Sequence, residues 1–161
     1  MAKKLNLVIL SFSSLCFIIQ GLTINPEDLD KYYKCYTYAK CFSDGPSADQ
    51  IEKCFSTLKP EELKSAYQLT KNNFFHYKSD DISGAVREFC HHDDATRRYA
   101  YNQTINGILA YHKKVCGDSD KAETCSRSEK GIECLFNLLK QLRQQGKCCV
   151  DGSVQNMAFN V

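Results

Sequence analysis

The 161-residue sequence contains no tryptophan and only three prolines, and short runs of alternating β-branched residues are almost absent. Such runs are typical of strands, so their scarcity argues against a sheet protein. No internal repeat or low-complexity tract is evident. The sequence also lacks a Gly-x-Ser-x-Gly nucleophile elbow and a glycine-rich phosphate loop, which argues against the common hydrolase and nucleotide-binding classes.

Neither sign of charge predominates. The full sequence has 21 Lys and Arg against 19 Asp and Glu. Lys3 and Lys4 lie in the expected leader, so the rest of the chain is formally neutral. A surface that binds phosphates needs a concentrated positive field. We therefore expect neither a nucleic-acid partner nor a polybasic membrane anchor.

Long apolar runs are confined to the N-terminus. Two lysines precede an apolar segment over residues 5–19, a pattern typical of a cleaved secretory signal peptide. The segment includes three serines and is shorter than the roughly 20 apolar residues that span a bilayer, so no membrane anchor is expected. The expected organisation is a signal peptide at 1–21, one helical disulfide-rich domain at 22–150 and a flexible tail at 151–161.

Cysteine, by contrast, is abundant, with ten residues, of which Cys16 lies in the expected leader. A secreted chain enters an oxidising compartment, where the other nine are expected to form a disulfide framework. Each bridge would add about 2–4 kcal/mol by restricting the unfolded chain. The candidates are Cys35, Cys41, Cys54, Cys90, Cys116, Cys125, Cys134, Cys148 and Cys149.

The spacing of the cysteines limits their pairing. Cys35 and Cys41 lie on one expected helix, about 9 Å apart along its axis and beyond disulfide reach, so each should bond to another helix. The same reasoning disfavours a bond between Cys125 and Cys134. Most spacings are longer than the Cys-x2–4-Cys pairs of structural zinc sites, and we assign no metal residue.

An odd number of cysteines leaves one over. It is expected to be free, buried, capped by a small thiol, or bonded to a second protein. The neighbours Cys148 and Cys149 should connect the C-terminus to two distant elements rather than to each other. Because chain ends are usually accessible, they are also the leading donors for a disulfide-linked dimer.

Apolar residues recur at three- to four-residue intervals, which predicts an all-α fold, a compact disulfide-stapled bundle of about five to six helices. Ser47 and Gln50 form a capping-box pattern, and Gly117 offers a helix stop. The expected helices are 25–42, a segment from 47 to about 58, 60–74, 80–90, 94–116 and a final helix over about 132–146, with 118–125 as a short helix or a loop.

The densest polar cluster runs from Cys90 to Asp94 and includes His91 and His92. Imidazole and carboxylate groups can form a metal site or a general base. On a helix, however, adjacent side chains point in different directions, and an N-cap role explains the acids. We therefore assign no catalytic, cofactor or metal residue and expect a protein that is not an enzyme. His112 falls on the apolar side of 94–116 and is expected in the core.

Asn102-Gln103-Thr104 is an N-glycosylation sequon. Asn102 is the glycosylation candidate, and its use would require that face of the helix to be exposed to solvent.

Tyrosine and phenylalanine supply all the aromatic side chains. They are expected either to fill the core or to line an apolar cavity, with tyrosine hydroxyls orienting the polar end of a ligand. The residues considered are Tyr32, Tyr33, Tyr36, Tyr38, Phe42, Phe55, Tyr67, Phe74, Phe75 and Phe89.

The run Cys116-x8-Cys125-x8-Cys134, which follows Cys54 and Cys90, resembles the later cysteines of arthropod odorant-binding-like proteins, and other arthropod secreted helical cysteine-rich proteins are similar. The resemblance covers this spacing alone. The family's early Cys-x3-Cys pair has no counterpart here, and the adjacent cysteines near the C-terminus are an addition. No functional residue of the family is therefore transferred.

These observations predict a secreted, non-enzymatic, extracellular protein that binds an apolar small molecule or an extracellular protein partner and needs no cofactor. One alternative is a venom or secretory effector that acts on a receptor. Another is a structural component of a secreted material, linked through its odd cysteine. A secreted hydrolase would depend on His92 or Asp93.

Overall fold

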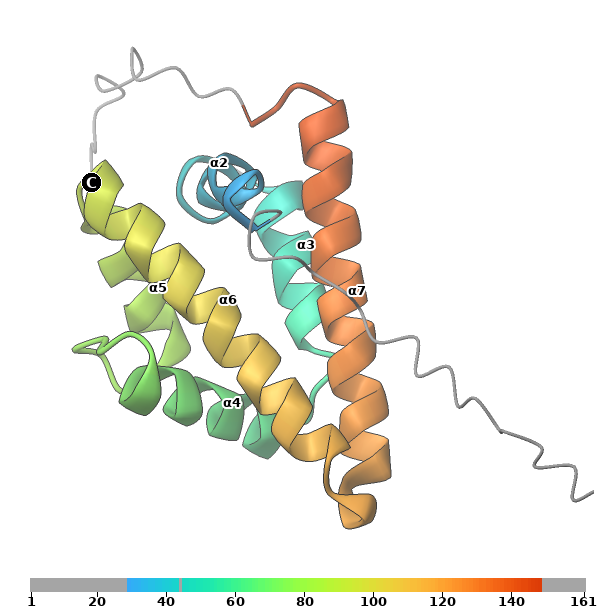
Figure 1. Ribbon diagram of the computed structural model, residues 1–161. Helices are drawn as coiled ribbons and strands as arrows, with labels where there is room; N and C mark the ends of the chain where they lie inside the picture. Colours follow the sequence, from blue (N-terminus) through green and yellow to red (C-terminus); the bar gives the residue numbers. More distant parts are fainter. Residues whose placement is uncertain (1–28, 44, 149–161) are drawn as a thin grey trace, which may run out of the picture.

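The computed structural model describes residues 29–43 and 45–148, and over these ranges the chain is a helical bundle stapled by four disulfides, as the sequence predicts (Figure 1). The described ranges contain no strand. The α-helices are α2 (Tyr33–Thr37), α3 (Pro46–Phe55), α4 (Pro60–Asn73), α5 (Ile82–His91), α6 (Asp94–Cys116) and α7 (Ala122–Gln144). Two further helices are the π-helix η1 (Tyr38–Phe42) and the 3₁₀-helix η2 (Ser119–Lys121).

The predicted signal peptide and C-terminal tail lie outside the described residues. Among the helices that are described, none combines the length and the apolar character that crossing a membrane requires.

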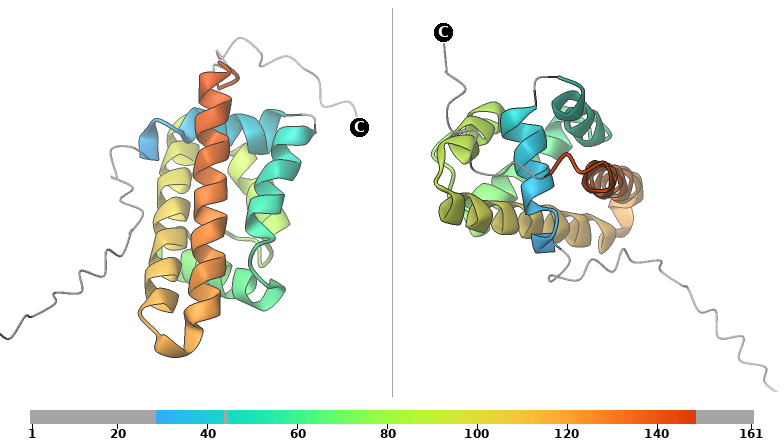
Figure 2. Two further views of the ribbon diagram at one scale, coloured as in Figure 1. Left: turned by 90° about the vertical axis from the view of Figure 1, so that its right-hand side faces the viewer. Right: turned by 90° about the horizontal axis from the view of Figure 1, so that it is seen from above.

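The two longest helices, α6 and α7, form the frame of the bundle (Figure 1). They are joined through Gly117 and η2, and they pack against each other. Helix α4 packs along α6, and α3 packs along α7. Seen from above, α2 lies across one end of the bundle, where it contacts both α6 and α7 (Figure 2). The following η1 contacts α3 and α5, and so bridges these two helices.

Aspartates cap two helices, and for α6 this is the role that the sequence predicts for the acids of the Cys90–Asp94 cluster. The Asp81 side chain accepts from the Gly84 N–H at the start of α5, and the Asp93 side chain accepts from the Thr96 N–H at 3.0 Å at the start of α6. These bonds satisfy backbone donors that a helix N-terminus leaves free. Helix α6 then ends at Cys116 with Gly117 as its C-cap, also as predicted.

Three local predictions need correction. The Ser47–Gln50 capping box is wrong, because α3 begins at Pro46 and Ser47 lies inside its first turn. Proline suits the first helical position, and Gly45 supplies the positive φ of 137° that the preceding turn requires. The first helix ends at Phe42 as expected but changes to π-helical geometry at Tyr38. The final helix begins earlier than predicted, at Ala122, so residues 122–125 are not a separate element.

Helix α7 ends in a glycine turn close to the predicted position. Gly146 has φ 69°, the Gly146 N–H donates to the Arg143 carbonyl, and the Lys147 N–H donates to the Leu142 carbonyl at 3.1 Å. This pair of bonds is a Schellman motif, which turns the chain away from the helix axis. Cys148 follows at once and bonds to Cys35 in α2.

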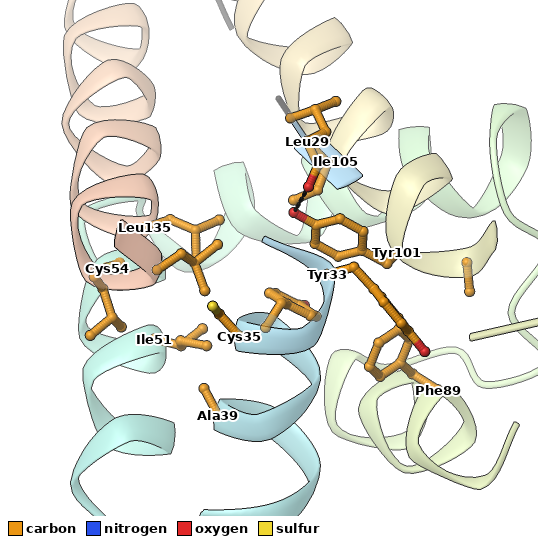
Figure 3. Close-up of a cluster of buried hydrophobic side chains, with 14 of the residues drawn as sticks. Leu29, Tyr33, Cys35, Ala39, Ile51, Cys54, Phe89, Tyr101, Ile105 and Leu135 are labelled. Carbon is orange, nitrogen blue, oxygen red and sulfur yellow. Dashed lines mark hydrogen bonds between the residues drawn. The ribbon is translucent and has the colours of Figure 1, made fainter. Parts of the chain in front are cut away.

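The core is built around tyrosine and phenylalanine rings from α2, α5 and α6 (Figure 3). Tyr36 contacts the rings of Phe89 and Tyr101, with centroids 5.5 and 5.3 Å away. The Tyr101 hydroxyl donates to the Leu29 carbonyl at 2.9 Å, the dashed line in Figure 3. Edge-on and tilted ring pairs of this kind stabilise a core beyond the area that they bury.

In the described residues, three disulfides connect different helical elements, and the fourth connects α2 to the turn that follows α7. The pairs are Cys35–Cys148, Cys41–Cys90, Cys54–Cys134 and Cys116–Cys125. The predictions that Cys35 does not bond to Cys41, and that Cys125 does not bond to Cys134, are confirmed. Cys148 reaches a distant element, as expected. Cys149 lies outside the described residues, so the role of the odd cysteine stays a prediction.

Candidate functional site

The candidate site is an apolar cavity inside the bundle. Its volume is about 100 Å³. The lining includes Tyr36, Lys40, Cys54, Phe55, Leu58, Leu63, Ala66, Tyr67, Thr70, Tyr77, Ile82, Ala85, Val86, Phe89, Thr104, Ile108, Tyr111, Ser128, Gly131, Ile132 and Leu135.

All the helices longer than five residues contribute to this lining. Each of these helices packs against a neighbour, so that together they surround the cavity. Helix α3 packs on α7, α7 on α6, and α6 on both α4 and α5. The bridge by η1 between α3 and α5 completes the enclosure. Disulfides fasten two of the walls, Cys54–Cys134 between α3 and α7 and Cys41–Cys90 between η1 and α5.

Most polar groups in the lining already have protein partners. The Tyr67 hydroxyl donates to the Ser79 carbonyl at 2.7 Å, and the Tyr77 and Thr104 hydroxyls share a hydrogen bond of 2.8 Å. The Thr70 hydroxyl donates to the Ala66 carbonyl at 3.0 Å, and Ser128 contacts the His112 ring nitrogen at 3.3 Å. Burial raises the pKa of both Tyr67 and Tyr77 to about 12, so these hydroxyls stay protonated.

Three polar groups of the lining have no polar partner within the described part of the chain. These groups are the Lys40 ammonium and the Tyr36 and Tyr111 hydroxyls. The Lys40 ammonium lies 5.8 Å from the centre of the Phe55 ring, a cation–π contact. Burial lowers the pKa of Lys40, although nearby Glu52 counteracts this. The polar end of a ligand could form hydrogen bonds or an ion pair with these groups.

Helix α4, which contains no cysteine, is held against α7 by a charged pair. The Arg127 guanidinium donates to both Glu62 carboxylate oxygens, at 2.5 and 3.0 Å, and the Thr124 hydroxyl donates to the same carboxylate at 2.7 Å. The hydrogen bonds from Arg127 lower the pKa of Glu62 to about 2, against burial, which would raise it. The Glu62 side chain is only 10% exposed.

This pair predicts a specific acid sensitivity. A folded pKa of about 2 against an ordinary value of 4.5 means that the contribution of Glu62 is complete above pH 4.5 and is lost as the pH falls towards 2. We expect Glu62→Gln to lower the free energy of unfolding at pH 7 by about 1.5–3 kcal/mol and to flatten its decline between pH 5 and 2. Urea titrations at several pH values measure both effects.

The neighbouring exposed carboxylate Glu61 provides the matched control. Glu61→Gln should leave the pH dependence of stability close to that of the unchanged protein. Equal flattening by both substitutions would show that general charge, rather than the Glu62–Arg127 pair, sets the acid sensitivity.

The structure disperses the predicted Cys90–Asp94 cluster, and none of its five residues lines the cavity. Cys90 is bonded to Cys41, and Asp93 caps α6. The Asp94 carboxylate accepts from the Tyr33 hydroxyl at 2.8 Å, and the His92 ring packs against Phe75 with centroids 5.7 Å apart. These contacts are structural, and they do not direct the side chains towards one substrate.

One other group of metal-ligating residue types lies outside the cavity lining. The ligand atoms of His112, Cys116 and Cys125 lie within 4.8 Å of one another. Both sulfurs belong to the Cys116–Cys125 disulfide, so they are not thiolates that could bind a metal. The sequence predicts His112 in the core, but it is only partly buried and contacts the Cys116 sulfur at 3.4 Å.

Aromatic residues take both roles that the sequence allows, although Phe42 takes neither, because it is 51% exposed. Tyr36, Phe55, Tyr67 and Phe89 line the cavity, and Tyr33 belongs to the buried core cluster. The sequence reasoning missed Tyr77, Tyr111 and Lys40. For Lys40 a signal was present, because it follows Tyr36 by four residues and so lies on the same side of a helix.

The glycosylation candidate Asn102 lies within α6 and is partly exposed. Thr104 of the same sequon faces the cavity and bonds to Tyr77. Glycosylation at Asn102 stays a prediction.

No family model, curated protein or solved structure matches the chain. The resemblance in cysteine spacing to odorant-binding-like proteins therefore stays a prediction, and the function has to be argued from the cavity itself.

Proposed function

We propose that the protein is a secreted carrier that binds one apolar small molecule in its internal cavity. The cavity is the observation that carries this proposal. Protein interiors are normally close-packed, so an apolar cavity of about 100 Å³ lined by residues from all six described α-helices departs from ordinary core packing. Cavities lined mainly by apolar and aromatic side chains are typical of sites for apolar small molecules. Four intramolecular disulfides support secretion, because such bonds persist mainly in oxidising compartments.

The direct test is native mass spectrometry of the protein purified from a eukaryotic secretion host. A retained ligand appears as additional mass that disappears under denaturing conditions. In the ligand-free protein, the neutral dye N-phenyl-1-naphthylamine should bind at one site per chain, and apolar compounds should displace it. The absence of both retained mass and dye binding would contradict the proposal and favour an effector that acts on a receptor.

Two substitutions on α7 separate the cavity from the rest of the core. Ile132 and Leu138 are both buried, 4% and 7% exposed, but only Ile132 lines the cavity. Ile132→Phe adds volume at the lining and should weaken dye binding by about tenfold, whereas Leu138→Phe should change it less than about twofold. Equal weakening by both would place the dye elsewhere or reveal general disruption of the core, which thermal unfolding would detect.

A further inference from the structure

Two of the unused polar groups in the cavity come from one stretch of chain. Tyr36 in α2 and Lys40 in η1 are four residues apart, and both line the cavity. Lys40 lies in the element that bridges α3 and α5, and Tyr36 lies in the preceding α2. The Tyr36 ring is fixed by Phe89 and Tyr101, so its hydroxyl has a defined position. Together they place an O–H donor and a cation at a cavity whose lining is mostly apolar.

The environment of Lys40 is unfavourable for a cation that has no carboxylate partner. Its side chain is partly buried between the cavity and the Phe55 ring. Glu52, the acid that stabilises its charge, is exposed and forms no ion pair with it in the described part of the chain. Removing an ammonium group from water is costly unless an anion accompanies it. An anion placed in the cavity would therefore gain a strong, poorly screened partner.

We propose that the ligand is an amphiphile with one carboxylate head and an apolar chain. The head pairs with the Lys40 ammonium and accepts a hydrogen bond from the Tyr36 hydroxyl, and the chain lies along the apolar lining. This inference rests on the proposed function, since it specifies the chemistry of the molecule in the same cavity.

The first experiment uses three ligands that share a ten-carbon chain. Decanoic acid, decanol and decylamine carry a negative, a neutral and a positive head at pH 7.4. Calorimetric titration into the full-length secreted protein should rank the acid about tenfold or more above the alcohol, with the amine weakest. Equal affinity for acid and alcohol, or a preference for the amine, would overturn the inference while leaving the carrier function intact.

Substitutions at Lys40 then test the assignment of the head group. Lys40→Met keeps an unbranched side chain that is shorter by one atom and removes its charge, so it should weaken decanoic acid binding by about tenfold and change decanol binding less than about twofold. Lys40→Arg should retain the preference for the acid. Lys34→Met, which changes an exposed lysine of α2, is the matched control and should have no effect.

Tyr36→Phe removes only the hydroxyl and should weaken the acid by several-fold while leaving the alcohol little changed. If Lys40→Met weakens acid and alcohol equally, Lys40 shapes the cavity rather than pairing with a carboxylate, and the inference fails. If neither ligand binds the unchanged protein and the neutral dye does not bind either, the carrier function fails with it. If the dye binds but the acid is not preferred over the alcohol, the carboxylate inference fails while the carrier function stands.

Discussion

Replacing both Cys54 and Cys134 with alanine should lower the free energy of unfolding by about 4.5 kcal/mol, because the bond closes a loop of 80 residues. The restriction that a disulfide places on the unfolded chain grows with the length of the loop it closes. Cys54 is also buried in the core and lines the cavity, so its loss removes packing between α3 and α7 as well. Guanidinium titration followed by circular dichroism measures the change.

The Cys116–Cys125 bond provides the internal comparison, because its cysteines are separated by only 9 positions. Removing it by the corresponding double alanine substitution should lower the free energy of unfolding by about 2.6 kcal/mol. Replacing both members of a pair leaves no new thiol to exchange with the other bridges. Equal losses in the two variants would show that loop length does not control the stabilisation in this protein.

The disulfides and the helix boundaries show what could be predicted from the sequence. A helix rises about 1.5 Å per residue, so the distance along the helix is enough to exclude a disulfide between Cys35 and Cys41. Helix starts at Asp81 and Asp93 follow from their side-chain oxygens, which satisfy nearby backbone N–H groups. Such signals depend on residues close together in the chain, and they are readable without knowledge of the fold.

The cavity could be predicted only as a possibility for the aromatic residues. Whether a ring fills the core or borders a space depends on how helices far apart in sequence pack, as with Tyr36 and Tyr77. The prediction of a capping box at Ser47 is wrong for a related reason. Ser47 and the Gly45-Pro46 pair are both suitable helix starts, and the local sequence pattern does not show which one the chain uses. The cation–π contact of Lys40 with Phe55 likewise depends on how η1 packs against α3.

Changing Gly107 to valine should destabilise the protein by about 3 kcal/mol or more, because this glycine allows α4 to approach α6 closely. A Cβ atom at Gly107 would lie 2.8 Å from the Thr70 Cβ and 2.9 Å from its Cγ2, well inside normal contact distance. Thr70 is only 3% exposed and its hydroxyl is bonded to the Ala66 carbonyl, so it cannot turn away freely. The clash therefore forces α4 outward, and chemical denaturation measures the loss.

Helix α4 is the wall of the cavity that no disulfide fastens, so this displacement should also weaken ligand binding. Combining Gly107→Val with Thr70→Ala removes two of the clashing atoms. The free energy of unfolding of the double variant should therefore be higher, by at least about 1 kcal/mol, than the sum of the two separate losses predicts. Asn106→Val, at the neighbouring position, controls for the lower helix propensity of valine and should change stability by less than about 0.7 kcal/mol. Strict additivity of the Gly107 and Thr70 substitutions would refute close contact between them, and with it the view that this contact sets the position of α4.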